Sequence, residues 1–395
     1  MSSIEREYAI DHLEVILKVA ERCNINCDYC YVFNRGNENW KIEPPIIRLD
    51  TVQVLADFLR RGALEHGVRR IQVDFHGGEP LLLKRPFFEE ICTLLRRTIE
   101  DVAEIRFALQ TNAILVNQEW IEIFQRQGVH VSVSLDGPRD LNDMHRIDHK
   151  GRGTYGATVK GLKLLQRAYE RGLLPMSPGV LCVVNPEFNG ADVYRHFVDD
   201  LGIKGMDFLL PDNNFDECTP KNVLGVTRYL IDAFKQWSSD DNPEIDVRIF
   251  STQLKTLLGS DAVFIGFSAQ VRRAVAFTVE SSGNIFVDDT LRSINDPVFN
   301  KIGNIVDTSL VEVLSSAPFM MLQSVSNTLP NVCEECVWRT VCSGGRPTNR
   351  FSAQNKFDNP SGYCSSLRAL YSECVGYLAR SGVELSKIEA VLNSN

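Results

Sequence analysis

The chain has 395 residues, of which 44% are hydrophobic and 24% charged, values typical of a globular protein and not of a disordered one. Its formal net charge of −9 disfavours a nucleic-acid partner, because a phosphate backbone repels an acidic surface. No apolar run approaches the roughly 18 residues that a membrane helix needs, and the first residues lack the apolar core of a secretory signal. We therefore expect a cytoplasmic protein without a membrane or nucleic-acid partner.

Short apolar runs alternate with longer amphipathic ones through the first half of the chain. The apolar runs predict strands buried on both faces, at 13–19, 71–75, 105–109, 129–135, 180–184 and 206–210. Helical patterns lie between them, at 50–66, 86–99, 117–127, 155–171 and 190–200. This alternation predicts an α/β fold whose parallel sheet is either open or curved like a barrel. No G-x-G-x-x-G follows the first strand, which disfavours a dinucleotide-binding fold.

The second half of the chain is less regular. We expect a helix near 222–238, then a hairpin of two alternating runs at 274–289, and helices near 308–322 and 365–381. The chain thus divides into three expected regions: a first domain at 10–215, a bridging region at 216–264 and a cysteine-rich α+β domain at 265–395.

Seven of the 11 cysteines fall into two groups, which in a reducing compartment indicates metal ligands and not disulfides. The first group, Cys23, Cys27 and Cys30, has the spacing C-x3-C-x2-C and directly follows the first strand. Three thiolates on one loop can hold three irons of a 4Fe–4S cluster and leave the fourth iron open to a small molecule. A tetrahedral zinc site needs a fourth ligand nearby, and no His or Cys follows at zinc-finger spacing.

Further polar and glycine motifs follow the next strands, where function gathers in barrel-like sheets. They are Phe75-His76-Gly77-Gly78-Glu79-Pro80, Gln110-Thr111-Asn112, Ser134-Leu135-Asp136-Gly137 and Arg146. Together with C-x3-C-x2-C, this order resembles radical S-adenosylmethionine (SAM) enzymes. The resemblance implies a partial (β/α)6 barrel, in which the first cluster reduces SAM to give a 5′-deoxyadenosyl radical. It also implies a set of SAM-binding residues: His76, Gly77, Gly78, Glu79, Pro80, Thr111, Asn112, Ser134, Asp136, Arg146 and Val183.

The second group has the spacing C-x2-C-x5-C and a distant fourth member: Cys333, Cys336, Cys342 and Cys364. Four thiolates can close a second 4Fe–4S cluster, and they fit a zinc ion equally well. The segment resembles the SPASM extension of peptide-modifying radical SAM enzymes, which favours the cluster.

This segment also departs from the SPASM pattern, which has seven cysteines and two auxiliary clusters. Arg346 stands where one cysteine is expected, and Val287 precedes Asp288 where the pattern has a Cys-Asp pair. We therefore expect one auxiliary cluster, hence two 4Fe–4S clusters in all. Cys218 and Cys374 are the other possible fourth ligands, and we prefer Cys364.

The Tyr31-Val32-Phe33-Asn34 continuation and the short extension most resemble maturases of ribosomally made peptides (RiPPs) that join an aromatic ring carbon to a β-carbon, giving a three-residue cyclophane. The resemblance implies a precursor peptide as substrate and an electron donor such as flavodoxin or ferredoxin. Asp288 is a candidate base, although a solvated turn carboxylate explains it equally well. The alternatives are thioether formation, epimerisation, sulfatase formylglycine maturation and, outside catalysis, an iron–sulfur redox sensor.

Overall fold

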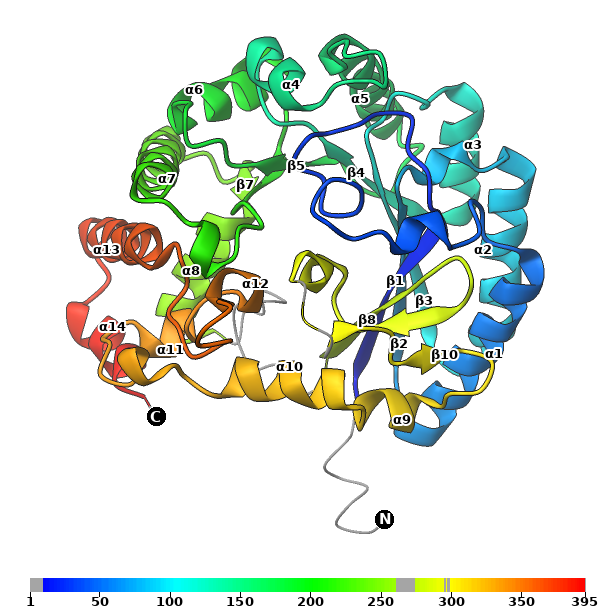
Figure 1. The fold of residues 1–395 in the computed structure, drawn as a ribbon. Helices are drawn as coiled ribbons and strands as arrows, with labels where there is room; N and C mark the ends of the chain where they lie inside the picture. Colours follow the sequence, from blue (N-terminus) through cyan, green and yellow to red (C-terminus); the bar gives the residue numbers. More distant parts are fainter. Residues whose placement is uncertain (1–9, 261–273, 295, 297–298, 395) are drawn as a thin grey trace. The chain divides into compact units, whose positions relative to one another are not determined.

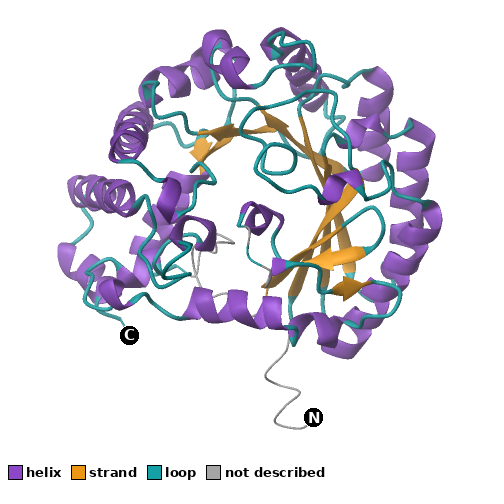
Figure 2. Cartoon of the chain, viewed as in Figure 1, coloured by secondary structure: helices purple, strands orange, loops and turns teal. Residues whose placement is uncertain are grey.

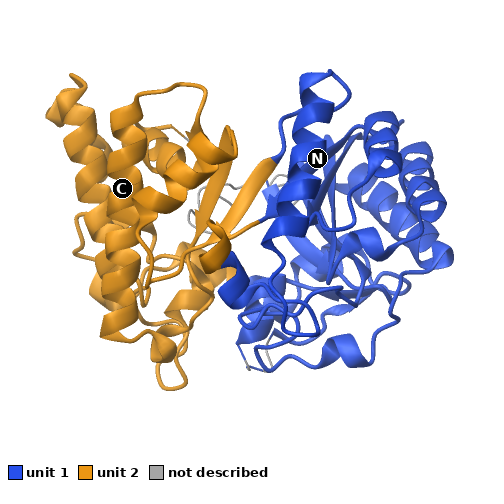
Figure 3. Cartoon of the chain, turned by 90° about the horizontal axis from the view of Figure 1, so that it is seen from above, with its two compact units in different colours: residues 1–134, 142–178, 272–320 blue, residues 135–141, 179–271, 321–395 orange. Residues whose placement is uncertain are grey.

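The computed structural model describes residues 10–260, 274–294, 296 and 299–394, and the chain forms two compact units (Figure 3). Unit 1 comprises 1–134, 142–178 and 272–320, and unit 2 comprises 135–141, 179–271 and 321–395. These units do not coincide with the three regions expected from the sequence. The expected boundary between 264 and 265 lies outside the described residues, and the three-region division stays a prediction.

Unit 1 is built on a sheet in the order β10-β9-β8-β1-β2-β3-β4. Strands β1 to β4 are parallel, as the sequence predicts, and β8 also pairs with β1 in parallel. The hairpin partner β9 and the short β10 are antiparallel additions at the edge. The bounds are β1 His12–Ala20, β2 Arg70–Gly77, β3 Glu104–Thr111, β4 Val129–Ser134, β8 Ala274–Val279, β9 Asn284–Phe286 and β10 Gly303–Asn304.

Amphipathic helices cover the outer face of this sheet (Figures 1 and 2). Phe75 of β2 packs on Phe88 and Phe107, and Phe88 in turn contacts Trp120, so apolar positions at helical spacing meet apolar positions at strand spacing. Burying each such side chain stabilises the fold by about 2 kcal/mol. The helices are α1 Leu49–His66, α2 Arg85–Ile99, α3 Gln118–Gln127, α5 Tyr155–Glu170 and α9 Leu310–Leu314.

Unit 2 contains three parallel strands in the order β5-β6-β7 and a set of helices. Its strands are β5 Gly179–Val183, β6 Gly205–Leu209 and β7 Asp246–Val247. Its helices are α6 Gly190–Arg195, α7 Pro220–Asp240, α8 Arg248–Leu257, α11 Arg339–Cys342, α12 Pro347–Arg350, α13 Cys364–Arg380 and α14 Leu385–Leu392. Two further helices have residues in both units: α4 Arg139–His145 and α10 Ala317–Asn327.

The predicted elements and the structure differ in a few places. The helix expected near 308–322 is two helices, α9 and α10, because the chain turns at Ser315 and Ser316. Helices α4, α8 and α14 were not predicted. Within the described ranges, no helix combines the length and the apolar character needed to cross a bilayer.

Candidate functional site

The loop that carries Cys23, Cys27 and Cys30 follows β1 and is held in place by hydrogen bonds within unit 1. Asn26 N donates to Ile147 O at 2.7 Å, and Asp28 N donates to His145 O at 3.2 Å. Asn112, at the end of β3, donates to Asn24 Oδ1 at 2.7 Å and lies 3.9 Å from the Cys23 sulfur. The cysteine loop is therefore anchored by the end of β3 and by the end of α4 with the segment that follows it.

The three thiols lie near one another. Burial raises the pKa of Cys23 to about 12, and the neighbouring Glu79, Cys27 and Cys30 add to this rise. Metal ligation requires thiolates, so a cationic cluster that displaces the thiol protons would stabilise this group. The residues present thus fit a cluster bound by three cysteines.

Gly77 and Gly78 allow the end of β2 to pass very close to the start of the cysteine loop. A Cβ on Gly77 would lie 2.2 Å from the Ala20 carbonyl oxygen, and one on Gly78 would lie 2.2 Å from that of Arg22. This close approach allows two backbone hydrogen bonds, in which Gly78 N donates to Ala20 O at 2.7 Å and Glu79 N donates to Arg22 O at 2.8 Å. We expected these glycines to admit a ligand, and the structure gives them a second role in placing the cysteine loop.

Substituting Gly78 tests this second role. Gly78→Ala should displace the backbone at Arg22 and sharply reduce the iron bound by the first cysteine group, because the added methyl has no room. The matched control is Gly205→Ala, since a Cβ at Gly205 meets nothing within 4 Å. Iron content after anaerobic reconstitution is the measurement, and equal iron in the two variants would contradict the interpretation.

Glu79 lies inside the structure and links two strand ends. Its side chain is 1% exposed and accepts hydrogen bonds from Thr111 Oγ1 at 2.6 Å, Asn112 N at 2.9 Å and Leu81 N at 3.0 Å. Burial raises the pKa of Glu79, and the three donors oppose this rise. Pro80 begins the short 3-10 helix η2, Pro80–Leu82. Glu79 therefore ties the end of β2 to the end of β3, and its contact with SAM stays a prediction.

The other expected SAM-binding residues lie in two places. In unit 1, Gln110 Nε2 donates to Ser134 Oγ at 2.7 Å, and Arg146, 6% exposed, donates to the Tyr29 hydroxyl at 2.9 Å. In unit 2, Asp136 Oδ1 accepts a hydrogen bond from Val183 N at 3.2 Å. Their contacts with SAM stay predictions.

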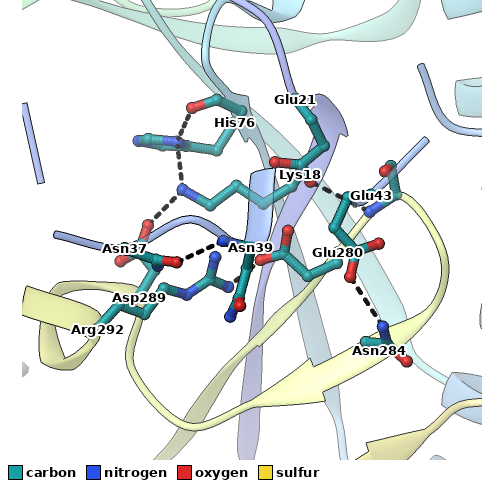
Figure 4. Close-up of polar contacts among 12 residues, drawn as sticks. Lys18, Glu21, Asn37, Asn39, Glu43, His76, Glu280, Asn284, Asp289 and Arg292 are labelled. Carbon is teal, nitrogen blue, oxygen red and sulfur yellow. Dashed lines mark hydrogen bonds and ion pairs between the residues drawn. The ribbon is translucent and has the colours of Figure 1, made fainter. Parts of the chain in front are cut away.

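A buried polar cluster, which we call the Lys18 cluster, joins Lys18, Tyr31, His76 and Asp289 in unit 1 (Figure 4 shows Lys18, His76 and Asp289). Lys18 is fully buried, and its Nζ lies 2.6 Å from Asp289 Oδ2 and 3.2 Å from His76 Nδ1. The hydroxyl of Tyr31, the residue after Cys30, donates to the same Asp289 oxygen at 2.5 Å. The cluster therefore connects the cysteine loop to the segment after β9.

Electrostatics fix the charges of this cluster. Burial alone would raise the pKa of Asp289, but the Lys18 ammonium, the nearby His76 and the hydrogen bonds from Lys18 and Tyr31 together outweigh it, and the pKa is about 2. Burial, aided by the charge of Lys18, lowers the pKa of His76 to about 4, so its imidazole is neutral at pH 7. Asp289 is thus an ionised partner of Lys18. Beside them, Glu280 pairs with Arg292, and Glu43 accepts a hydrogen bond from Asn284 at 2.8 Å (Figure 4).

Removing the cation of this pair should destabilise the fold. Lys18→Met leaves the Asp289 carboxylate buried without its ammonium, and breaking a buried ion pair in this way costs about 3–5 kcal/mol. The control Lys41→Met removes an exposed ion pair with Glu38 and should change the free energy of unfolding by less than about 1 kcal/mol. Denaturant unfolding compares the two, and similar losses would show that the Lys18 pair is not buried.

Sequence reasoning singled out Asp288 and missed its neighbour. Asp288 is the N-cap of the 3-10 helix η5, Asp289–Ser293, and its Oδ1 accepts hydrogen bonds from the amide and hydroxyl of Thr290, both at 2.8 Å. Asp289 points into the Lys18 cluster instead. Lys18, between Leu17 and Val19 in the apolar half of β1, was the available indication that a distant carboxylate would be needed.

One cavity in unit 2 brings the second cysteine group together. Cys333, Cys336, Cys342 and Cys364 all line it, whereas Cys218 and Cys374 do not. Burial raises the pKa of Cys342 to about 12, and the other three thiols add to the rise. Although no three His, Cys, Asp or Glu side chains form a single-ion site in the described part of the chain, four thiols around one cavity suit a multi-iron cluster.

Hydrogen bonds hold the loops around this cavity. The buried guanidinium of Arg350 donates to the carbonyls of Val325 at 2.6 Å, Thr328 at 3.2 Å and Phe357 at 2.9 Å. Arg346, at the position where the SPASM pattern has another cysteine, instead forms an ion pair with Asp212 at 3.1 Å.

The chain is similar to known proteins over most of its length. Residues 17–183 match the model of the Radical SAM superfamily. A cysteine-type anaerobic sulfatase-maturating enzyme of Clostridium perfringens is 25% identical over 371 residues, covering 91% of this chain and 95% of the relative. A serine-type enzyme of Klebsiella pneumoniae is 26% identical, covering 85% and 82%.

A solved structure described as "Native anSMEcpe with bound AdoMet and Cp18Cys peptide" superposes with a TM-score of 0.78 at 23% identity, covering 94% of this chain and 98% of that one. The expected α/β fold is thereby confirmed. The relatives named by these comparisons mature sulfatases, so the expected cyclophane chemistry is not confirmed.

Proposed function

We propose that this enzyme, whose residues 17–183 form a radical SAM domain, matures a ribosomally made peptide by joining an aromatic ring carbon to the β-carbon of a nearby residue. The observation that carries the proposal is the pair of cysteine sites. Three thiols on one loop leave a position open for SAM, whereas four thiols around one cavity leave none. This is one auxiliary site fewer than the SPASM pattern contains.

The chain's own residues supply ligands and positions. Cys23, Cys27 and Cys30 would hold the first 4Fe–4S cluster, which together with SAM provides the radical chemistry that breaks an unactivated C–H bond. Cys333, Cys336, Cys342 and Cys364 would hold the auxiliary cluster. The close approach at Gly77 and Gly78 places the first loop, and the buried carboxylate of Glu79 holds the ends of β2 and β3 together.

Crosslinking requires the peptide to lose one electron and one proton after the new bond forms. Asp288 remains our candidate for accepting the proton, although its carboxylate also caps η5. Asp289 is a poorer candidate, because a carboxylate whose pKa is about 2 holds protons weakly. Thus the paired Asp289 positions the cysteine loop through Tyr31, and Asp288 stays the predicted base.

A second candidate function is the oxidation of a Ser or Cys in a sulfatase to formylglycine. The similarity to sulfatase-maturating enzymes over about nine tenths of the chain favours it. Val287 and Arg346 stand where the two-cluster SPASM pattern has cysteines. This departure from the pattern counts against the second candidate.

Mass spectrometry after anaerobic incubation with SAM and a reductant tests both functions. The substrate is a precursor peptide or sulfatase encoded beside the gene, with deuterium on the ring of its aromatic residues. Cyclophane closure should remove two hydrogens in total, one of them a ring deuterium. An aldehyde that reacts with hydrazide, with all ring deuterium retained, would replace our proposal with the second candidate.

A further inference from the structure

Tyr371 lies behind the four-cysteine cavity of unit 2. It is seven residues after Cys364 on α13, two helical turns along the same face. Its side chain is fully buried, and its ring packs against Trp338 with 5.5 Å between ring centroids. Since Trp338 and Cys364 both line the cavity, Tyr371 is held against the wall of the auxiliary site.

The Tyr371 hydroxyl is buried, and within the described part of the chain its hydrogen-bonding neighbour is the Cys342 thiol, at a geometry too poor to count as a formed hydrogen bond. Native structures rarely leave such a group without a good partner, because the hydrogen bond that it gives up to water is then not replaced. The hydroxyl lies near the Cys342 thiol, close enough for each group to affect the ionisation of the other. A neutral thiol is a weak acceptor, whereas a thiolate bound to iron carries the negative charge that strengthens a hydrogen bond.

We propose that Tyr371 donates a hydrogen bond to the Cys342 sulfur when the auxiliary cluster is bound, and thereby raises the reduction potential of that cluster. This inference rests on the auxiliary cluster of the proposed function. Reduction adds an electron to the cluster, so a donor to its sulfur stabilises the reduced form more than the oxidised form. Tyr371 is thus a positioning residue that favours electron transfer from the substrate to the cluster.

The other side chains around the cavity act in the same direction. Arg339 and Arg368 both line it, and their positive charges also favour the more negative, reduced cluster. Neither guanidinium replaces the missing acceptor of Tyr371, because a guanidinium only donates hydrogen bonds.

The chain offers a matched tyrosine–thiol pair as a control. Tyr229 is also fully buried in unit 2, with its hydroxyl 3.5 Å from the Cys182 sulfur. Cys182 belongs to neither cysteine group, so losing the Tyr229 hydroxyl should leave the auxiliary cluster unaffected. Tyr229→Phe therefore measures the general effect of removing a buried hydroxyl from this unit.

A redox titration of the auxiliary cluster, followed by electron paramagnetic resonance, tests the inference. The full chain would carry Cys23, Cys27 and Cys30 as Ala, so that only the auxiliary cluster contributes. Tyr371→Phe should lower the equilibrium constant for reduction about tenfold, which is about 59 mV for a one-electron couple. Tyr229→Phe should leave the potential unchanged. An unchanged potential in Tyr371→Phe, or equal shifts in both variants, would overturn the inference.

Iron analysis distinguishes failure of this inference from failure of the proposed function. If the parent of the titration series binds no iron, the auxiliary cluster itself is wrong. If only Tyr371→Phe fails to bind iron, 3-fluorotyrosine placed at position 371 keeps the ring and makes the hydroxyl a stronger donor. The potential should then rise above that of the parent, and no rise would overturn the hydrogen bond.

Discussion

Replacing Cys23, Cys27 and Cys30 together with alanine should reduce the formation of 5′-deoxyadenosine from SAM to background. The three thiols lie on one anchored loop and are the proposed ligands of the cluster with an open position, so this cluster should not form without them. The measurement is liquid chromatography of reactions containing a strong reductant. The control Cys218→Ala removes a half-buried thiol outside both cysteine groups. SAM cleavage at the parent's rate in the triple variant would contradict the assignment.

Replacing Cys333 and Cys336 with alanine should have a different effect, allowing some SAM cleavage but blocking the crosslinked product. These cysteines line the cavity in unit 2, whereas the three-cysteine loop belongs to unit 1. We expect the auxiliary cluster to act only in the late step, when it accepts an electron from the peptide. Measuring 5′-deoxyadenosine and product in the same reaction gives both quantities.

Loss of the auxiliary cluster could also unfold the loops that it joins. The comparison therefore requires a variant whose circular dichroism matches that of the parent. A folded variant that still forms product at the parent's rate would show that the auxiliary cluster is structural and accepts no electron.

The strands and the first cysteine loop were predictable because their patterns are local. Strands such as β2 and β3 alternate buried apolar residues with polar ones, which buries one face and not both as expected, and they end in polar motifs. Cysteine spacing is likewise visible without the fold. The parallel pairing of β8 with β1 was not predictable. A hairpin pattern indicates which two strands the turn joins, but it does not indicate which other strand pairs with the free edge of the hairpin.

The parts of the site that were missed depend on contacts between distant residues. Lys18 and Asp289 are 271 positions apart, and their pairing is visible only in the fold. Asp288 and Asp289 look alike in the sequence, yet one caps η5 and the other lies in the Lys18 cluster. The sequence around Tyr371 likewise gives no indication of the place of its buried hydroxyl, because a tyrosine at an apolar position of a helix normally indicates core packing.

Iron and sulfide analysis of anaerobically reconstituted protein tests the central claim, that the chain builds one open and one closed cluster. The parent chain should bind about eight irons and eight sulfides, and the Cys23, Cys27 and Cys30 triple variant about four of each. The Cys333 and Cys336 double variant should also bind about four, and the combined variant none. About twelve irons in the parent, or zinc held by the second cysteine group, would contradict the claim.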